Sequence, residues 1–225
     1  MSSERGKVPM PLKIFLGGKM ILLADEKGVS SFPADWTIEY RSGERLRDVF
    51  KEFSAEPGVK SLAFWSQRNN FPELKREFLS LFGFVEAAGG IVENEKGELL
   101  FIFRRGKWDL PKGKISDSGK KKKKGSKQKE TPAEAALREV REETGIRKLN
   151  LVRETSSTWH IYSIKKKILL KRTRWFEMKS DSGEKLIPET REDITKVEWI
   201  SRKSLPKVLQ NTYASLTELI AAYGR

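Results

Sequence analysis

Three glutamates lie close together in the run Arg138-Glu139-Val140-Arg141-Glu142-Glu143-Thr144-Gly145-Ile146, and their spacing constrains the chain more than its composition does. Glu139, Glu142 and Glu143 stand at positions i, i+3 and i+4, which share one face of a helix with 3.6 residues per turn. Carboxylates crowded in this way repel one another unless a cation lies among them. Grouped oxygen ligands suit Mg²⁺ or Mn²⁺ better than Zn²⁺, so the spacing predicts a helix that carries a divalent-metal site.

The residues before and after this run support the helix. Thr131-Pro132-Ala133-Glu134 is a capping box with proline at the first helical position, and Gly145 suits the C-terminal end. Arg138 lies four residues from both Glu134 and Glu142, where it can pair with them and orient the acidic face. The alternative is a solvated surface helix with ion pairs. The apolar positions predict which face meets the core: Ala133, Ala136, Leu137 and Val140.

Glu130, followed after seven residues by Arg138 to Ile146, resembles the second part of the Nudix box. That pattern runs Gly, five residues, Glu, seven residues, Arg-Glu-aliphatic-any-Glu-Glu-any-Gly-aliphatic, and every fixed position from Glu130 onward is met. Gly113 resembles the opening glycine. It precedes Glu130 by 17 positions (130 − 113), where the pattern has 6, so 11 residues are inserted. The resemblance covers roughly residues 84 to 210.

The resemblance implies an α/β/α sandwich with a mixed sheet in residues 83–225, and the pattern of residues 1–82 predicts a small α/β domain before it. It also implies a metal-dependent hydrolase that cleaves a pyrophosphate bond in a nucleoside diphosphate linked to another moiety. Glu130 would be a helper ligand and Arg138 would orient the glutamates. The Mg²⁺ or Mn²⁺ ligands implied are Glu139, Glu142, Glu143 and the turn at Gly113.

The general base stays open among Glu142, Glu143 and Glu192, with Glu189 as a further candidate. In similar Nudix enzymes an acidic residue in the stretch corresponding to residues 189–194 approaches the metal centre. Glu192 is the first candidate here and Glu189 the second, beside Glu142 and Glu143 from the box itself. The alternative for this stretch is an acidic loop that precedes a strand.

Basic residues surround the glycine turn. Trp108-Asp109-Leu110-Pro111-Lys112-Gly113-Lys114 resembles the Nudix subgroup that acts on diadenosine polyphosphates and diphosphoinositol polyphosphates. The first-ranked substrate is therefore a (di)nucleoside polyphosphate, while nucleotide sugars, ADP-ribose and oxidised nucleoside triphosphates stay open. The cations expected to bind substrate phosphates are Arg104, Arg105, Lys112 and Lys114.

A lysine-rich loop interrupts the box at residues 115–129. It holds seven lysines and one aspartate, a net charge of +6 (7 − 1), and no apolar residue after Ile115. One interpretation is a surface insertion without function. Another is an electrostatic lure for a polyanion such as a long polyphosphate, an inositol pyrophosphate or RNA, and a third is a nuclear-import signal.

Alternating and amphipathic patterns predict the remaining elements. In the first domain a hairpin spans 13–23, helices span 44–53 and 72–81, and a strand spans 59–65. Its roles, in order of preference, are packing on the second domain, dimerisation and covering the substrate cleft. In the second domain, strands span 84–92, 98–103, 149–164, 168–178 and 196–200, and one amphipathic helix spans 204–223. Aromatic residues on the paired strands fill a core, or one or two stack on a base.

Composition excludes several kinds of site. The 225 residues include no cysteine and one histidine, which rules out disulfides, thiolate metal sites and histidine-rich zinc sites. No apolar run approaches a membrane span, and the chain is expected to be cytoplasmic, to act on a small-molecule nucleotide and to need no membrane. Two alternatives to the leading function remain: a nucleotide-binding regulatory domain without catalysis, and an RNA 5′-end pyrophosphohydrolase that uses the lysine-rich loop.

Overall fold

A computed structural model describes residues 10–41, 45–116, 129–165 and 167–223. The chain divides into two compact units. The first comprises Met1–Phe84 together with Trp159–Leu170, and the second comprises Val85–Thr158 together with Lys171–Arg225. Strands β9 (Asn150–Ile164) and β10 (Lys167–Lys179) therefore contribute residues to both units, whereas the sequence placed both strands in the second domain.

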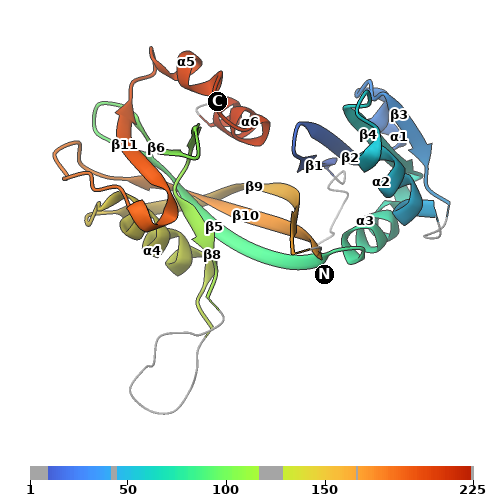
Figure 1. Cartoon of the computed structure of the whole chain (residues 1–225), viewed down its shortest axis with the longest axis horizontal. Coiled ribbons are helices and arrows are strands. Elements are labelled where there is room, and N and C mark those ends of the chain that lie inside the picture. The colour runs from blue at the N-terminus through green and yellow to red at the C-terminus, as the bar shows by residue number, and fades with distance from the viewer. Residues whose placement is uncertain (1–9, 42–44, 117–128, 166, 224–225) are drawn as a thin grey trace, which may run out of the picture. The chain divides into compact units, whose positions relative to one another are not determined.

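The first unit is built on strands β1, β2, β4 and β3 with helices packed on them, together with the ends of β9 and β10 (Figure 1). Its strands run in the order β1-β2-β4-β3; β1 and β2 form an antiparallel hairpin, and β2, β4 and β3 are parallel. The residues Phe15 and Leu16 of β1 also pair with β9. The elements are β1 (Leu12–Leu16), β2 (Lys19–Asp25), α1 (Glu26–Ser30), β3 (Trp36–Glu39), α2 (Leu46–Ala55), β4 (Ser61–Ser66), η2 (Arg68–Asn70) and α3 (Phe71–Ser80).

Aromatic residues dominate the core of this unit. Phe50 makes edge contacts with Phe78 and Phe82 at centroid distances of 6.2 and 5.0 Å, and Phe64 packs on Phe78. The predicted hairpin, both predicted helices and the predicted strand at 59–65 are confirmed. The sequence missed α1 and β3, because five and four residues are too few for a helical or alternating pattern to emerge.

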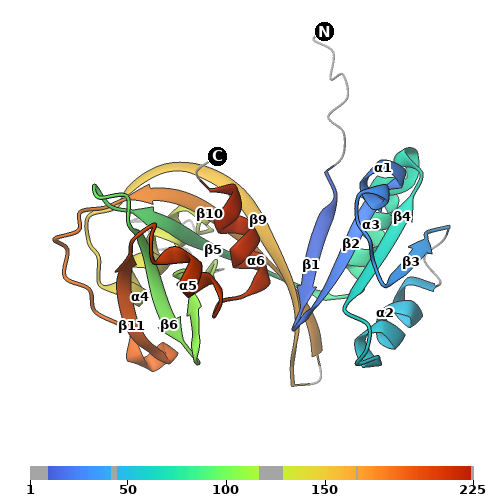
Figure 2. The same cartoon turned by 90° about the horizontal axis from the view of Figure 1, so that it is seen from above.

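The second unit is a sheet covered by helices on both faces (Figure 2). Its main strands run in the order β11-β6-β5-β10-β9, with β7 paired to β6 and β8 paired to β5. Successive side chains of β6 face opposite sides of the sheet. Leu100 and Ile102 therefore pack toward α4, whereas Leu99 and Phe101 pack toward α5 and α6. The further elements are β5 (Gly83–Glu93), β6 (Leu99–Arg104), β7 (Lys107–Asp109), β8 (Lys112–Lys114), α4 (Pro132–Thr144), η3 (Thr190–Glu192), β11 (Ile194–Ile200), α5 (Leu205–Leu209) and α6 (Ala214–Ala222).

Taken over both units, the strand pairs include parallel and antiparallel ones, so the predicted α/β class with a mixed sheet is confirmed. The lysine-rich stretch 117–128 lies outside the described residues. Among the residues that are described, no helix is long and apolar enough to cross a membrane.

The prediction of one closing helix over 204–223 was wrong. The chain forms two helices, α5 and α6, with a break at residues 210–213. The break is held to β7: the backbone N–H of Trp108 donates to the carbonyl of Asn211 at 3.0 Å, and the hydroxyl of Thr212 donates to the carbonyl of Trp108 at 2.7 Å. These tertiary bonds compensate for the helical bonds that are lost there.

Candidate active site

Helix α4 begins and ends where its sequence signals are. The hydroxyl of Thr131 accepts from the backbone of Glu134, the carboxylate of Glu134 accepts from the backbone of Thr131, and Pro132 occupies the first turn. Gly145 ends the helix in the left-handed region at φ 78°. The predicted capping box and glycine stop are therefore confirmed, and they fix which face of α4 meets the sheet.

Three carboxylates from two elements converge beside α4. Oxygens of Glu139 and Glu143 on α4 and of Glu192 on η3 lie within 4.8 Å of one another. Glu142, which the sequence placed in the metal-binding trio, lies outside this group. Its side chain is 57 % exposed and pairs with Arg138 at 3.0 Å. Glu192, expected as a base near the metal centre, contributes directly to the three-carboxylate group instead.

Glu143 is the most desolvated of these carboxylates. It is fully buried, and its Oε2 accepts from the backbone N–H of Lys112 at 2.8 Å. Its Oε1 has no hydrogen-bond partner among the described residues, with a guanidinium nitrogen of Arg104 3.6 Å away. Burial raises the pKa of Glu143 to about 8, against the opposing effect of Lys112. A buried carboxylate with one unsatisfied oxygen is a good ligand for a cation.

Glu139 is a second buried carboxylate whose pKa is raised. Burial is the largest cause that raises its pKa above the ordinary value, and the nearby Arg138 opposes the shift. Gly113, on β8, lies directly against its side chain: a Cβ on Gly113 would stand 2.1 Å from the carboxyl carbon of Glu139. Only glycine fits here, so the glycine turn and the glutamate are built for close contact.

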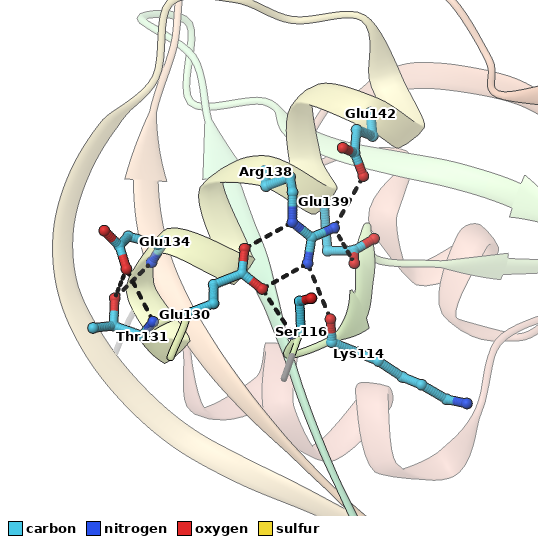
Figure 3. Close-up of polar contacts among 8 residues, drawn as sticks. All are labelled: Lys114, Ser116, Glu130, Thr131, Glu134, Arg138, Glu139 and Glu142. Atoms are coloured by element: carbon cyan, nitrogen blue, oxygen red, sulfur yellow. Dashed lines mark hydrogen bonds and ion pairs between the residues drawn. The ribbon is translucent and has the colours of Figure 1, made fainter. Parts of the chain in front are cut away.

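Arg138 organises the acidic face from the other side (Figure 3). Its Nε and Nη2 donate to the two oxygens of Glu130 at 2.8 and 3.0 Å, and its Nη1 donates to Glu139 at 2.6 Å and Glu142 at 3.0 Å. Nη2 also donates to the carbonyl of Lys114 at 3.0 Å. One guanidinium therefore joins three carboxylates to the strand that carries Gly113. The hydrogen bonds to Glu130 are the largest cause of the raised pKa of Arg138.

Glu130 also holds the strand β8 in place. Besides Arg138, its carboxylate accepts from the backbone N–H of Ser116 at 2.8 Å (Figure 3). Ser116 and Glu130 flank the stretch 117–128. The two ends of the insertion are thus joined by a direct bond, which leaves the glycine turn and α4 in contact in spite of the added residues.

The four cations predicted to bind phosphate differ in their surroundings. Arg104 lies between two carboxylates, 3.6 Å from Glu143 and 3.5 Å from Glu192. Arg105 pairs with Asp193 at 3.0 Å. The Lys112 amine donates to the buried Asp109 at 2.6 Å. Burial lowers the pKa of Lys112, but Asp109 and Glu143 outweigh it and the net shift is upward. Lys114 contributes its carbonyl to Arg138.

Lys171 on β10 belongs to the same charge cluster, and the sequence did not single it out. Burial, followed by the charge of Lys112, lowers its pKa to about 8, and Asp109, Arg104 and Lys114 also act on it. No motif surrounds it. The one feature of the sequence that could have pointed to Lys171 is its place in a predicted strand, close to Leu170 and Thr173, which are both buried.

The Asp109–Lys112 pair yields a stability prediction. We expect Asp109→Ala to lower the free energy of unfolding by about 2–4 kcal/mol, because the Lys112 amine would stay buried without a counter-charge. Urea denaturation measures this loss. A double variant, Asp109→Leu with Lys112→Met, should recover most of it, since both charges are then gone.

Asp48 and Lys51 provide the matched control, because they form an exposed pair with the same three-residue spacing, 3.4 Å apart. Asp48→Ala should cost less than about 1 kcal/mol. If Asp109→Ala proved no more harmful than Asp48→Ala, the buried pair would not hold the turn as described.

Comparisons with known proteins show which family the chain resembles. The family model described as NUDIX domain matches residues 83–221. No curated protein matches the chain. Among solved structures, the chain is similar to a C. elegans Ap4A hydrolase in a binary complex (21 % identity, 61 % of this chain, 93 % of that chain, TM-score 0.44). It is also similar to a MutT protein from Methanosarcina mazei (23 %, 62 %, 92 %, 0.44) and a NUDIX hydrolase from Nitrosomonas europaea (20 %, 62 %, 87 %, 0.40).

Proposed function

The chain belongs to the Nudix family of pyrophosphohydrolases, and on that premise we propose that it uses a divalent metal ion to hydrolyse a pyrophosphate bond in a (di)nucleoside polyphosphate. The observation that carries the proposal is the convergence of Glu139, Glu143 and Glu192, with one buried oxygen of Glu143 lacking a hydrogen-bond partner among the described residues.

The three-carboxylate group fits a hard divalent cation. It offers carboxylate oxygens alone, which suits Mg²⁺ or Mn²⁺. Burial of Glu139 and Glu143 opposes their ionisation, so a cation among them would relieve a cost that the fold otherwise bears. Glu139, Glu143 and Glu192 would hold the ion. When bound, it neutralises phosphate charge and acidifies a coordinated water.

The chain's own residues supply orientation and charge. Arg138 fixes the directions of Glu139 and Glu142, and Gly113 permits β8 to approach Glu139. Arg104 and Lys171 provide positive charge for substrate phosphates. Lys112 is occupied by Asp109, so we assign it to the turn rather than to the substrate.

We propose Glu142 as the group that accepts the proton of the attacking water. Of Glu139, Glu142 and Glu143, it alone lies outside the three-carboxylate group, its side chain is exposed, and Arg138 holds its Oε2. A general base must lie within hydrogen-bond reach of the water it deprotonates, and Glu142 does not have the role of holding the ion that we assign to Glu143. Glu192 is the second candidate.

The lysine-rich stretch gives a prediction about salt. We propose that residues 117–128 attract long anionic substrates. Deleting them should raise KM for the most highly charged substrate by about tenfold at low ionic strength, and the difference should vanish near 1 M salt, where the Debye length is about 3 Å. Steady-state kinetics over a range of NaCl concentrations measures the effect. The bond between Ser116 and Glu130 should keep the deletion variant folded.

An unchanged KM at low salt would show that the stretch plays no part in substrate capture. A matched variant with the lysines of 117–128 changed to glutamine, at unchanged chain length, separates loss of charge from loss of length.

The proposed function is tested by turnover. Purified protein with Mg²⁺ is incubated with diadenosine tetraphosphate, nucleoside triphosphates, ADP-ribose, a diphosphoinositol polyphosphate and 5′-triphosphorylated RNA. A Glu142→Gln/Glu143→Gln double variant is the control. Metal-dependent turnover of a nucleoside polyphosphate that the double variant lacks supports the proposal. Tight binding with no turnover of any compound would favour a regulatory binder, and turnover of RNA alone would favour 5′-end processing.

A further inference from the structure

A pocket of about 520 Å³ lies on the second unit, at the ends of β6 and β11. These two strands run side by side in an antiparallel pair (Figures 1 and 2). One wall comes from Phe103, Arg105 and Gly106, and the other from Thr190, Asp193 and Thr195. None of the six belongs to the Nudix box or to the three-carboxylate group.

The pocket adjoins the proposed reaction centre through both walls. Arg104, which stands between Phe103 and Arg105, faces Glu143 and Glu192 at 3.6 and 3.5 Å. Successive side chains of a strand point to opposite sides, so β6 directs Arg104 to the carboxylates and Phe103 to the other side, while Arg105 follows the strand in a turn. On the other wall, Glu192 is followed directly by Asp193. The pocket and the carboxylates are thus linked by consecutive residues at the ends of β6 and η3.

The two walls meet at a pair of strained residues. Arg105 and Asp193 both occupy the left-handed region, at φ 51° and 61°, and the guanidinium Nε of Arg105 lies 3.0 Å from Asp193 Oδ2. Such conformations cost on the order of 1–2 kcal/mol each for residues other than glycine. The ion pair holds the turn after β6 and the turn before β11 together at the pocket.

The lining combines a flat ring with hydrogen-bonding groups. Phe103 is half-buried and fixed by an edge contact with Trp108 at 5.1 Å between ring centroids, so it offers a rigid apolar surface. Thr190 and Thr195 are exposed residues. The Thr195 hydroxyl donates to the carbonyl of Phe103 at 3.3 Å and can still accept, and a threonine hydroxyl such as that of Thr190 can donate and accept. A ring for stacking beside hydroxyls and a charged pair suits a nucleobase with its ribose.

We propose that this pocket binds the nucleoside end of the substrate, while the phosphate chain extends past Arg104 to the three-carboxylate group. The inference rests on the proposed function and deepens it, because it names the group next to the cleaved phosphates. Its volume falls within the range of small-ligand sites, about 300–1,000 Å³. A second hollow, about 350 Å³ beside Glu142, contains no aromatic ring in its lining of Arg141, Glu142, Gly145, Ile146, Arg147, Ile187, Pro188 and Glu189.

The test fills the pocket. Thr195→Trp adds an indole at an exposed wall position on β11, where aromatic residues are well tolerated. Calorimetry with AMP and with inorganic tripolyphosphate compares the affinities. We expect AMP binding to weaken at least about tenfold, or 1.4 kcal/mol, while tripolyphosphate binding stays within about twofold. Thr195→Ser should retain AMP binding. Val152→Trp adds the same ring on the exposed face of β9 and should change neither affinity.

The outcomes separate the inference from the proposed function. Unchanged AMP affinity in a folded Thr195→Trp variant overturns the pocket assignment, even if the wild type hydrolyses nucleotides. Equal loss of AMP and tripolyphosphate binding also overturns it, because the substitution would then act on the phosphate site. Selective loss of AMP binding supports the assignment even if no substrate is hydrolysed, in which case the proposed function alone fails.

Discussion

Replacing Glu143 with glutamine is expected to lower kcat by on the order of a thousandfold, about 4 kcal/mol of transition-state stabilisation. The substitution keeps the shape of the side chain and its bond from the backbone of Lys112, but it removes the buried negative charge that we assign to the metal. Stopped assays with saturating substrate and Mg²⁺ measure kcat. Glu198→Gln, an exposed glutamate on β11, is the matched control and should be close to wild type.

The same variant should be more stable than the wild type in the absence of metal. Burial raises the pKa of Glu143 in the folded chain to about 8 from 4.5, so the folded state favours the protonated carboxyl. The unfolded chain releases this proton near pH 4.5 and the folded chain near pH 8. The free energy of unfolding therefore falls as the pH rises through this window, and Glu143→Gln escapes the loss.

Thermal melts in EDTA from pH 5 to pH 8 check this consequence. The gap in Tm between Glu143→Gln and the wild type should widen with pH in EDTA and narrow when Mg²⁺ is added, since the ion binds the charged carboxylate. Full activity in the variant would remove Glu143 from the catalytic centre. A pH-independent gap would mean that its carboxyl is not buried as described.

Replacing Arg138 with alanine should reduce both activity and stability. Its guanidinium joins Glu130, Glu139 and Glu142 and reaches the carbonyl of Lys114, so its loss leaves partly buried carboxylates without a counter-charge (Figure 3). We expect a loss of about 2–4 kcal/mol in the free energy of unfolding and a fall in kcat of about a hundredfold.

Arg138→Lys distinguishes charge from geometry. Lysine keeps the positive charge, but it cannot reproduce the two parallel bonds to Glu130 with a further bond to Glu139, so stability should recover more than kcat. Arg141→Ala on the same helix is the control, because the guanidinium of Arg141 donates to the carbonyl of Arg147 at 3.3 Å. Equal effects of Arg138→Ala and Arg141→Ala would contradict the organising role of Arg138.

Local features of the second unit could be predicted from the sequence because the chain itself encodes them. The capping box at Thr131, the glycine stop at Gly145 and the helix between them depend on residues a few positions apart. The two strand pairs around the box also emerged from alternation. The closing helix was mispredicted because bonds to β7, distant in sequence, decide its break at Asn211 and Thr212.

Site geometry depends on contacts that no local pattern contains. The spacing of Glu139, Glu142 and Glu143 places all three on one face, but the position of the sheet decides which of them converge. Oxygens of Glu139 and Glu143 converge with Glu192 of η3, and Arg138 bonds both Glu139 and Glu142. Glu192 lies 49 residues after Glu143 (192 − 143), so only the fold brings their oxygens together.

The partners of the charged residues likewise could not be predicted from the sequence. Lys112 was read from its turn as a phosphate ligand, yet the neighbouring Asp109 is buried with it and binds its amine. Lys171 lies in no motif, and its place near Lys112 comes from strand β10 crossing the site. A single sequence shows that a charge is present, whereas its partner depends on burial.

Whether Glu139, Glu143 and Glu192 hold a metal ion is tested most directly by measuring Mn²⁺ binding with electron paramagnetic resonance. Wild-type protein is titrated with Mn²⁺ beside the single variants Glu139→Gln, Glu143→Gln and Glu192→Gln, and beside Glu198→Gln as control. We expect the wild type and the control to bind Mn²⁺. Each of the three other variants should bind it at least about tenfold more weakly, and their turnover should fall in parallel. Undiminished Mn²⁺ binding in all three variants would contradict this expectation, because the converging carboxylates would then not hold the metal.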